Sequence, residues 1–174
     1  MSGNLGDILV TPRLRLLAAT PAMIDAELEG PGRLELILEA VIPPDWPPEH
    51  HDRETLEFWR ERLAEPAAAG WWLHYAVLTE SEPDTLVGSV GYKGPPEDGV
   101  VEIGYSVVPS WQRRGLATEA TGALIEEAWA RGANVVVAHT LEHLTPSIAV
   151  LRKLGFEPIE SSQRNELEFT LRRG

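Results

Sequence analysis

The chain has 174 residues, 43% of them hydrophobic, which is enough for one domain with a sizeable core. Its formal net charge of -12 argues against non-specific nucleic-acid binding and favours a cationic partner such as an amine, although acidity serves solubility equally well. The absence of cysteine excludes disulfides and thiol catalysis, and no apolar run is long enough to span a membrane. We therefore expect a single domain over residues 1–174, located in the cytoplasm, with no membrane or nucleic-acid partner.

The first half of the chain predicts short helices and an early β-hairpin. Four prolines between Pro43 and Pro48 exclude a regular helix or a central strand, so residues 43–52 are expected to form a loop. Alternating and helical apolar spacings place the other elements. These are a flexible tail over 1–7, a strand over 13–17, helices over 20–30, 34–42 and 53–63, and hairpin strands over 71–78 and 85–92.

The stretch Val101–Thr118 organises the rest of the chain. Alternation over 101–108 predicts a strand, which Pro109 ends because proline has no N–H to pair. A short basic turn around Gly115 follows, and apolar residues then repeat at helical spacing as far as Gly132. Such a turn at a helix N-terminus exposes unpaired N–H groups that suit a phosphate. The remaining elements are a strand over 134–140 buried on both faces, a helix from Thr145 to Gly155 with Thr145 as its cap, and a last strand over 166–171.

The basic turn has alternative interpretations. An ordinary strand–turn–helix connection with solvated arginines accounts for the turn alone equally well. A nucleotide-phosphate site is disfavoured, because no lysine follows Gly115 as a Walker loop requires.

Two separated segments favour one family. The chain resembles the GCN5-related N-acetyltransferase (GNAT) superfamily in its acyl-CoA pyrophosphate loop, which reads Val107-Val108-Pro109 and then Gln112-Arg113-Arg114-Gly115-Leu116-Ala117. Residues 147–156, with the pattern S-x-x-V-L-x-K-L-G-F, and residues 102–105 are similar to the branch that acetylates ribosomal-protein N-termini.

This resemblance implies an α+β (mixed α/β) fold. Its mostly antiparallel sheet has six to seven strands flanked by helices, and its fourth and fifth strands splay apart. Here these strands are 101–108 and 134–140, and the pantetheine arm of the coenzyme would lie in the wedge between them. Members of the family often pair, so we also expect a homodimer.

The resemblance also implies an activity and a set of cofactor contacts. The activity is transfer of an acetyl group from acetyl-CoA to a primary amine, either a protein N-terminus or a small molecule, by direct attack in a ternary complex. The alternative is a CoA-binding sensor or structural module without turnover. The residues implied in coenzyme binding are Val107, Val108, Gln112, Arg113, Arg114, Gly115, Leu116, Ala117, Thr118 and Ser147.

Three side chains are candidates for the chemistry. Glu102 and His139 are candidate bases for the amine, with a solvated strand-edge glutamate and a structural histidine as the alternatives. Ser147 matches the family serine near the sulfur, and its alternative is an ordinary serine in the first turn of a helix.

Two positions depart from the family pattern, and two adjacent histidines raise the question of a metal site. Leu151 stands where many members carry a tyrosine acid, and Leu144 or Thr145 replaces an asparagine. His50 and His51 do not indicate a metal site, because adjacent residues rarely point at one ion. We expect no metal.

Overall fold

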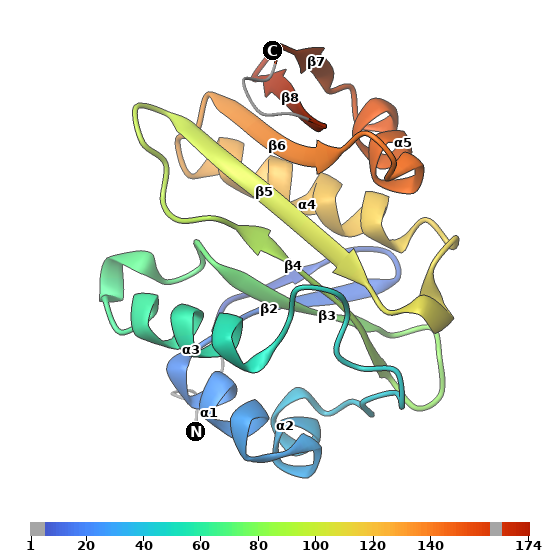
Figure 1. Cartoon of the computed structure of the whole chain (residues 1–174). Coiled ribbons are helices and arrows are strands. Elements are labelled where there is room, and N and C mark those ends of the chain that lie inside the picture. Colours follow the sequence, from blue (N-terminus) through green and yellow to red (C-terminus); the bar gives the residue numbers. More distant parts are fainter. Residues whose placement is uncertain (1–5, 161–164) are drawn as a thin grey trace.

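A mixed sheet of eight strands forms the centre of the structure, a computed structural model that describes residues 6–160 and 165–174 (Figure 1). The strand order is β1-β2-β3-β4-β5-β6-β8-β7, and β5 and β6 are its parallel pair. The strands are β1 Ile8–Val10, β2 Leu14–Ala18, β3 Leu73–Leu78, β4 Thr85–Tyr92, β5 Val100–Val107, β6 Val135–Leu141, β7 Glu157–Ile159 and β8 Glu166–Arg172. The α-helices are α1 Pro21–Glu29, α2 Pro31–Leu38, α3 Arg53–Arg62, α4 Leu116–Ala130 and α5 Thr145–Lys153, and short 3₁₀ turns cover Pro66–Ala68 and Pro109–Trp111.

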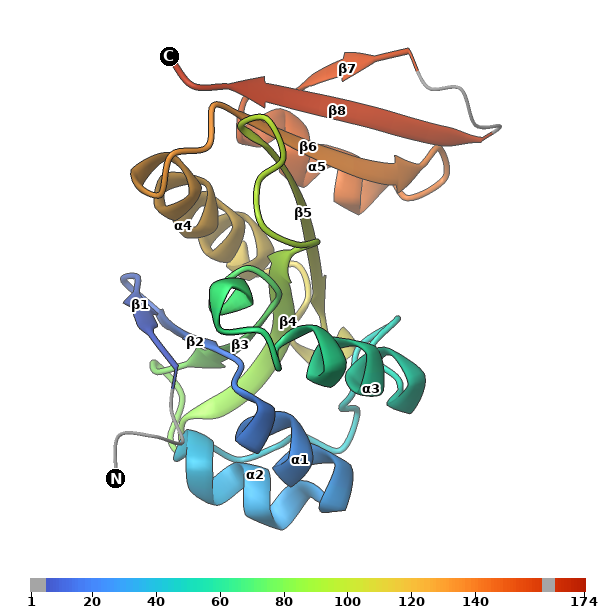
Figure 2. The same cartoon turned by 90° about the vertical axis from the view of Figure 1, so that its left-hand side faces the viewer.

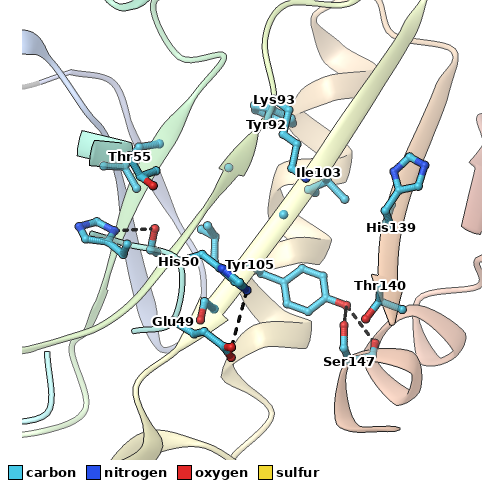
Figure 3. A pocket seen from close by; sticks show the side chains of 18 of the residues that line it. Glu49, His50, Thr55, Tyr92, Lys93, Ile103, Tyr105, His139, Thr140 and Ser147 are labelled. Atoms are coloured by element: carbon cyan, nitrogen blue, oxygen red, sulfur yellow. Dashed lines mark hydrogen bonds and ion pairs between the residues drawn. The ribbon is translucent and has the colours of Figure 1, made fainter. Parts of the chain in front are cut away.

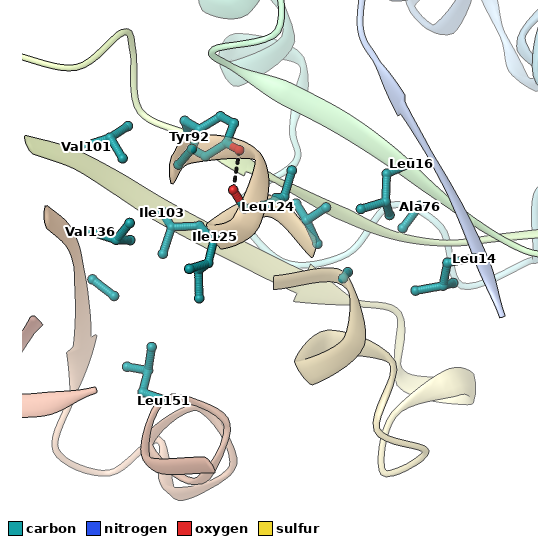
Figure 4. Packing of buried hydrophobic residues seen from close by; sticks show 14 of the residues in the cluster. Leu14, Leu16, Ala76, Tyr92, Val101, Ile103, Leu124, Ile125, Val136 and Leu151 are labelled. Carbon is teal, nitrogen blue, oxygen red and sulfur yellow. Dashed lines mark hydrogen bonds between the residues drawn. The ribbon is translucent and has the colours of Figure 1, made fainter. Parts of the chain in front are cut away.

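Helices cover both faces of this sheet. Figure 2 shows α4 on one side of β4 and β5, and α1 to α3 on the other. Alternate residues of a strand serve the two layers. Leu16 of β2 packs into the cluster that contains Leu124 and Ile125 of α4 (Figure 4), whereas Leu17 packs with Ile24 of α1. The predicted amphipathic patterns therefore correspond to two separate cores.

Strands β5 and β6 hold the two halves of the sheet together over a short distance. Their parallel pairing covers three residue pairs, from Val100 with Val135 to Glu102 with Val137. Beyond Glu102 the strands diverge (Figure 1). This confirms the predicted mixed α+β class and the splay between 101–108 and 134–140.

Two strands were not predicted from the sequence. The edge strands β1 and β7 bring the sheet to eight strands instead of six to seven. Each has three residues, which is too short to show a periodicity. Of the predicted tail over 1–7, residues 1–5 lie outside the described part of the chain, and the Asp7 carbonyl accepts a hydrogen bond from the Ala18 N–H.

Two expectations about the C-terminal half were wrong. The strand over 134–140 is not buried on both faces, because Val136 and Ala138 are buried while His139, on the opposite face of the strand, is exposed. The layer formed by α1 to α3 ends before it reaches β6, which leaves that face partly open (Figure 2). Helix α5 begins at Thr145 itself, with Leu144 at the capping position and no side-chain cap, so Thr145 is not the cap.

Within the described residues, no helix combines the length and the apolar character needed to cross a bilayer.

Candidate active site

A cavity of about 770 Å³ opens where β5 and β6 diverge. Residues 103–106 of β5 and 138–141 of β6 line its two sides, and Ser147 lies at its edge (Figure 3). Aromatic residues of α3 and of the turn just before β3 form another wall, namely Phe58, Trp59 and Trp72. The cavity therefore joins the wedge in the sheet to a pocket under α3.

The backbone of β5 offers hydrogen-bonding groups to the wedge. Val108 donates its N–H to Val87 O at 2.9 Å, and Lys93 donates to Glu102 O at 2.9 Å. In an antiparallel ladder, residues alternate between facing the partner strand and facing away. Val107 therefore turns its N–H away from β4 and toward the gap. Of the two valines implied in binding pantetheine, only Val107 keeps an N–H free of β4.

The basic turn has the backbone shape of an anion site. Arg113 and Gly115 adopt left-handed conformations, with φ of 64° and 76°. Gly115 is the capping residue of α4, so the N–H groups of residues 116–118 have no acceptor inside the helix. Alternating left-handed residues before such a terminus form a concave nest of N–H groups, as a diphosphate requires. These residues fit the pyrophosphate of coenzyme A.

Side chains hold this turn in place. Gln112 donates from Nε2 to Val107 O at 2.8 Å, which closes the turn onto the end of β5. Arg13, from the turn before β2, donates from Nη1 to Arg114 O at 2.9 Å and from Nε to Glu119 Oε1 at 2.8 Å. Burial disfavours the Glu119 carboxylate, but hydrogen bonds from Thr11 and Arg13 outweigh it and lower the pKa of Glu119. The sequence analysis missed this brace, because Arg13 and Glu119 are far apart in the chain.

The two candidate bases lie together. His139 Nδ1 is 3.2 Å from Glu102 Oε2, and the same oxygen is 2.8 Å from Lys93 Nζ. His139 Nε2 also faces the carboxylates of Glu166 at 3.8 Å and Glu168 at 3.6 Å. His139 lines the cavity, whereas Glu102 lies just beyond it, where β5 and β6 begin to part. The Glu102 carboxylate is thus engaged by two neighbouring side chains.

Ser147 is tied to β5 across the wedge. The Tyr105 hydroxyl donates to Ser147 O at 2.9 Å and lies 3.1 Å from Ser147 Oγ (Figure 3). Burial raises the pKa of Tyr105, so its phenol remains a neutral hydrogen-bond donor. Leu151, at the position of the family tyrosine, is buried in the core, and Leu144 presents an apolar side chain to the cavity. Leu151 has no hydroxyl, so the phenol beside Ser147 comes from Tyr105 of β5.

The two adjacent histidines point to different places. His50 lies against Glu49 on the surface, with Nε2 3.8 Å from Oε1, whereas His51 is buried and bonded to Glu27 and Ser89. Sequence reasoning missed Glu27 and Ser89, since neither stands in a recognisable motif. Across residues 6–160 and 165–174, no group of three or more His, Cys, Asp or Glu side chains is placed to hold a metal ion.

Comparisons with known proteins agree with this geometry. Residues 34–157 match the family model of the acetyltransferase (GNAT) domain. The chain is 28% identical over 151 residues to the uncharacterized N-acetyltransferase YjdG of Bacillus subtilis (strain 168), covering 86% of this chain and 89% of that protein. The chain therefore belongs to the GNAT family and is an acyltransferase of the N-acetyltransferase class.

Solved structures share the fold. An acetyltransferase from Agrobacterium tumefaciens str. C58 superposes with a TM-score of 0.66 at 20% identity, over 96% of this chain and 95% of that one. The RimL ribosomal L7/L12 alpha-N-protein acetyltransferase in complex with coenzyme A gives a TM-score of 0.64 at 17% identity, over 95% and 98%.

Proposed function

We propose that this acyltransferase takes its acetyl group from acetyl-CoA and transfers it to a primary amine by direct attack in a ternary complex. The observation that carries the proposal is that three features follow one another along the end of β5 and into the wedge. The turn around Gly115 is bonded through Gln112 to the Val107 carbonyl, and Ser106, the neighbour of Val107, lines the cavity between β5 and β6. A solved relative by fold, RimL, is a complex with coenzyme A, which supports the choice of donor.

The residues of the wedge have distinct proposed roles. The N–H groups of residues 113–118 hold the diphosphate, and the Val107 N–H binds the pantetheine arm or polarises the acyl carbonyl. Ser147, which Tyr105 holds at the edge of the cavity, would donate a hydrogen bond to the departing sulfur. Holding donor and acceptor together in this way supplies several kcal/mol by orientation alone, on the order of 7 or more in favourable cases.

The acceptor side favours an amine that carries positive charge. Phe58, Trp59 and Trp72 supply apolar walls, and the carboxylates of Glu49 and Glu166 line the same cavity. A net charge of -12 adds long-range attraction for a cation. Within this class we propose a protein N-terminus or a small-molecule amine as the acceptor.

Turnover tests the proposal. Purified protein is mixed with acetyl-CoA and a panel of amines, namely N-terminal peptides, polyamines and amino acids, while thiol release and product mass are recorded. We expect sustained thiol release with at least one acceptor. Tight coenzyme binding without turnover on any amine would instead support a CoA-binding sensor.

We also propose that the protein is cytoplasmic and forms a homodimer, as expected from the sequence and the family. Analytical ultracentrifugation of the purified chain measures the oligomeric state directly, and a monomer at all concentrations would contradict the second statement.

A further inference from the structure

A chain of buried polar side chains crosses the helical layer beside the cavity. His51 Nε2 lies 2.7 Å from Glu27 Oε2, and His51 Nδ1 lies 3.1 Å from Ser89 Oγ. Glu27 also accepts hydrogen bonds from the Tyr75 hydroxyl at 2.7 Å and from Trp46 Nε1 at 2.9 Å. These groups come from α1, the loop before α3, β3 and β4, so tertiary packing assembles the chain.

The carboxylate and the imidazole of this cluster are both almost fully buried from solvent. The His51 side chain is 1% exposed and that of Glu27 is 8% exposed. Burial opposes ionisation of Glu27, but the hydrogen bond and charge of His51 and the hydrogen bonds of Tyr75 and Trp46 outweigh it and lower its pKa. Because buried polar groups are costly unless fully paired, an apolar cluster would support the fold more simply.

The hydrogen bonds of His51 have a defined direction. An ionised carboxylate only accepts hydrogen bonds, so His51 Nε2 carries the hydrogen directed at Glu27. When the ring carries no second proton, its Nδ1 atom is an acceptor to which the Ser89 hydroxyl, 3.1 Å away, can donate. The order carboxylate, imidazole, hydroxyl makes the serine oxygen the outer end of a proton relay.

Both ends of the relay meet a cavity. Ser89 and His51 line the 770 Å³ cavity, and Ser89 stands opposite Ser106, one residue from Val107 on β5. Glu27, Trp46 and His51 line a second cavity of about 450 Å³. The cluster thus connects the proposed acceptor pocket with a separate opening.

We infer that Ser89, His51 and Glu27 form a relay that removes a proton from the acceptor amine. The inference rests on the proposed function. An ammonium has three N–H bonds and the amide product has one, so two protons leave, one of which ends on the coenzyme thiol. The other passes to the Ser89 oxygen as the serine hydroxyl hydrogen moves to His51 Nδ1, and the Nε2 proton then leaves through Glu27 to the second cavity. Ser89 is the group that touches the amine, and His51 and Glu27 act through it.

Several titratable and charged residues line the two cavities beside His51. Besides Glu27, these groups are Glu49 and His50 on the side of the first cavity, and Asp52 and Arg53 on the side of the second. Tyr75 remains neutral, because burial, its largest influence, raises its pKa well above the ordinary range.

Ser89→Ala tests the relay while leaving the His51–Glu27 pair intact. With wild-type enzyme and an acceptor from the amine panel, kcat is measured as a function of pH. We expect kcat of Ser89→Ala to fall on the order of 100-fold where the amine is mostly protonated. The loss shrinks as pH rises, because more of the amine is then already deprotonated in solution and needs no relay. The KM for acetyl-CoA stays unchanged.

Thr85→Val is the matched control. It removes another buried, hydrogen-bonded hydroxyl of β4, which lies outside the cavity, and we expect a wild-type pH profile. A second variant, His51→Gln, loses the imidazole, and its coenzyme affinity by calorimetry shows whether it remains folded. We expect it to bind coenzyme and to share the pH-dependent loss of Ser89→Ala.

The outcomes separate the two proposals. If the wild-type enzyme turns over and Ser89→Ala keeps its kcat, or loses the same factor at every pH, the relay is refuted and acetyl transfer stands. That result would shift attention to Glu102 and His139 as the base. If the wild-type protein acetylates no amine, the proposed function fails and the relay fails with it.

Discussion

His74 is the residue whose burial most clearly couples stability to pH. It is 3% exposed on β3, and its ring packs edge-on against Tyr92 with the ring centroids 5.9 Å apart. Burial disfavours the imidazolium and lowers the pKa of His74 from 6.5 to about 4. The folded protein therefore keeps this ring neutral at pH values where the unfolded chain protonates it.

We expect His74 to weaken the fold in mild acid. Between the unfolded pKa of 6.5 and the folded pKa of about 4, the unfolded state binds a proton that the folded state does not. The free energy of unfolding thus falls as pH drops through this window, by on the order of 3 kcal/mol in total. Urea denaturation of wild type and His74→Phe across the window measures the difference, and parallel curves would contradict it.

The turn between β5 and α4 is an element whose shape depends on one glycine. Gly115 has φ of 76°, and a Cβ there meets Arg13 Nη2 at 3.4 Å. At the other end of α4, Gly132 has φ of 97°, and a Cβ there meets no heavy atom of the described residues within 4 Å. The two glycines share a left-handed conformation, which strains any residue with a Cβ, but they differ in what surrounds them.

We expect Gly115→Glu to abolish most coenzyme binding. Its carboxylate would repel the diphosphate at the N–H nest, and the affinity for acetyl-CoA should fall at least about tenfold. Gly132→Glu adds the same charge and a comparable backbone strain, of about 1 kcal/mol, but should leave the affinity unchanged. Isothermal titration calorimetry compares the two variants, and equal affinities would disprove the position of the coenzyme.

The wedge between β5 and β6 divides the sheet of the molecule into two parts. One part of the sheet is β1 to β5, the other is β6, β8 and β7, and three residue pairs of β5 and β6 join them. A coenzyme in the wedge would bridge both parts.

We therefore expect coenzyme A to stabilise the protein as a unit. At a free concentration of about 100 Kd, binding adds roughly 2.7 kcal/mol to the free energy of unfolding. Hydrogen exchange should show added protection along β5 and β6 beyond Glu102, where the strands part. Gly115→Glu should show neither effect, and protection confined to the α1–α3 layer would contradict a coenzyme in the wedge.

Features encoded over short stretches of sequence were predictable. The helix that starts after Gly115, its apolar face, and the hairpin of β3 and β4 all follow from spacings of two to four residues. The turn around Gly115, for which we propose diphosphate binding, is likewise contiguous, so its glycine and basic residues stand out in the sequence. The exceptions were β1 and β7, which are too short to carry a period.

Features that join distant residues were not predictable from the chain alone. His51 lies 24 residues from Glu27 and 38 from Ser89, and Arg13 lies 106 from Glu119. A local pattern reports which face of a strand or helix is apolar, but it does not report which polar groups meet after packing. Whether the histidine at 50 or at 51 is buried therefore depends on the helices that pack over them, and so do the hydrogen bonds beside the cavity.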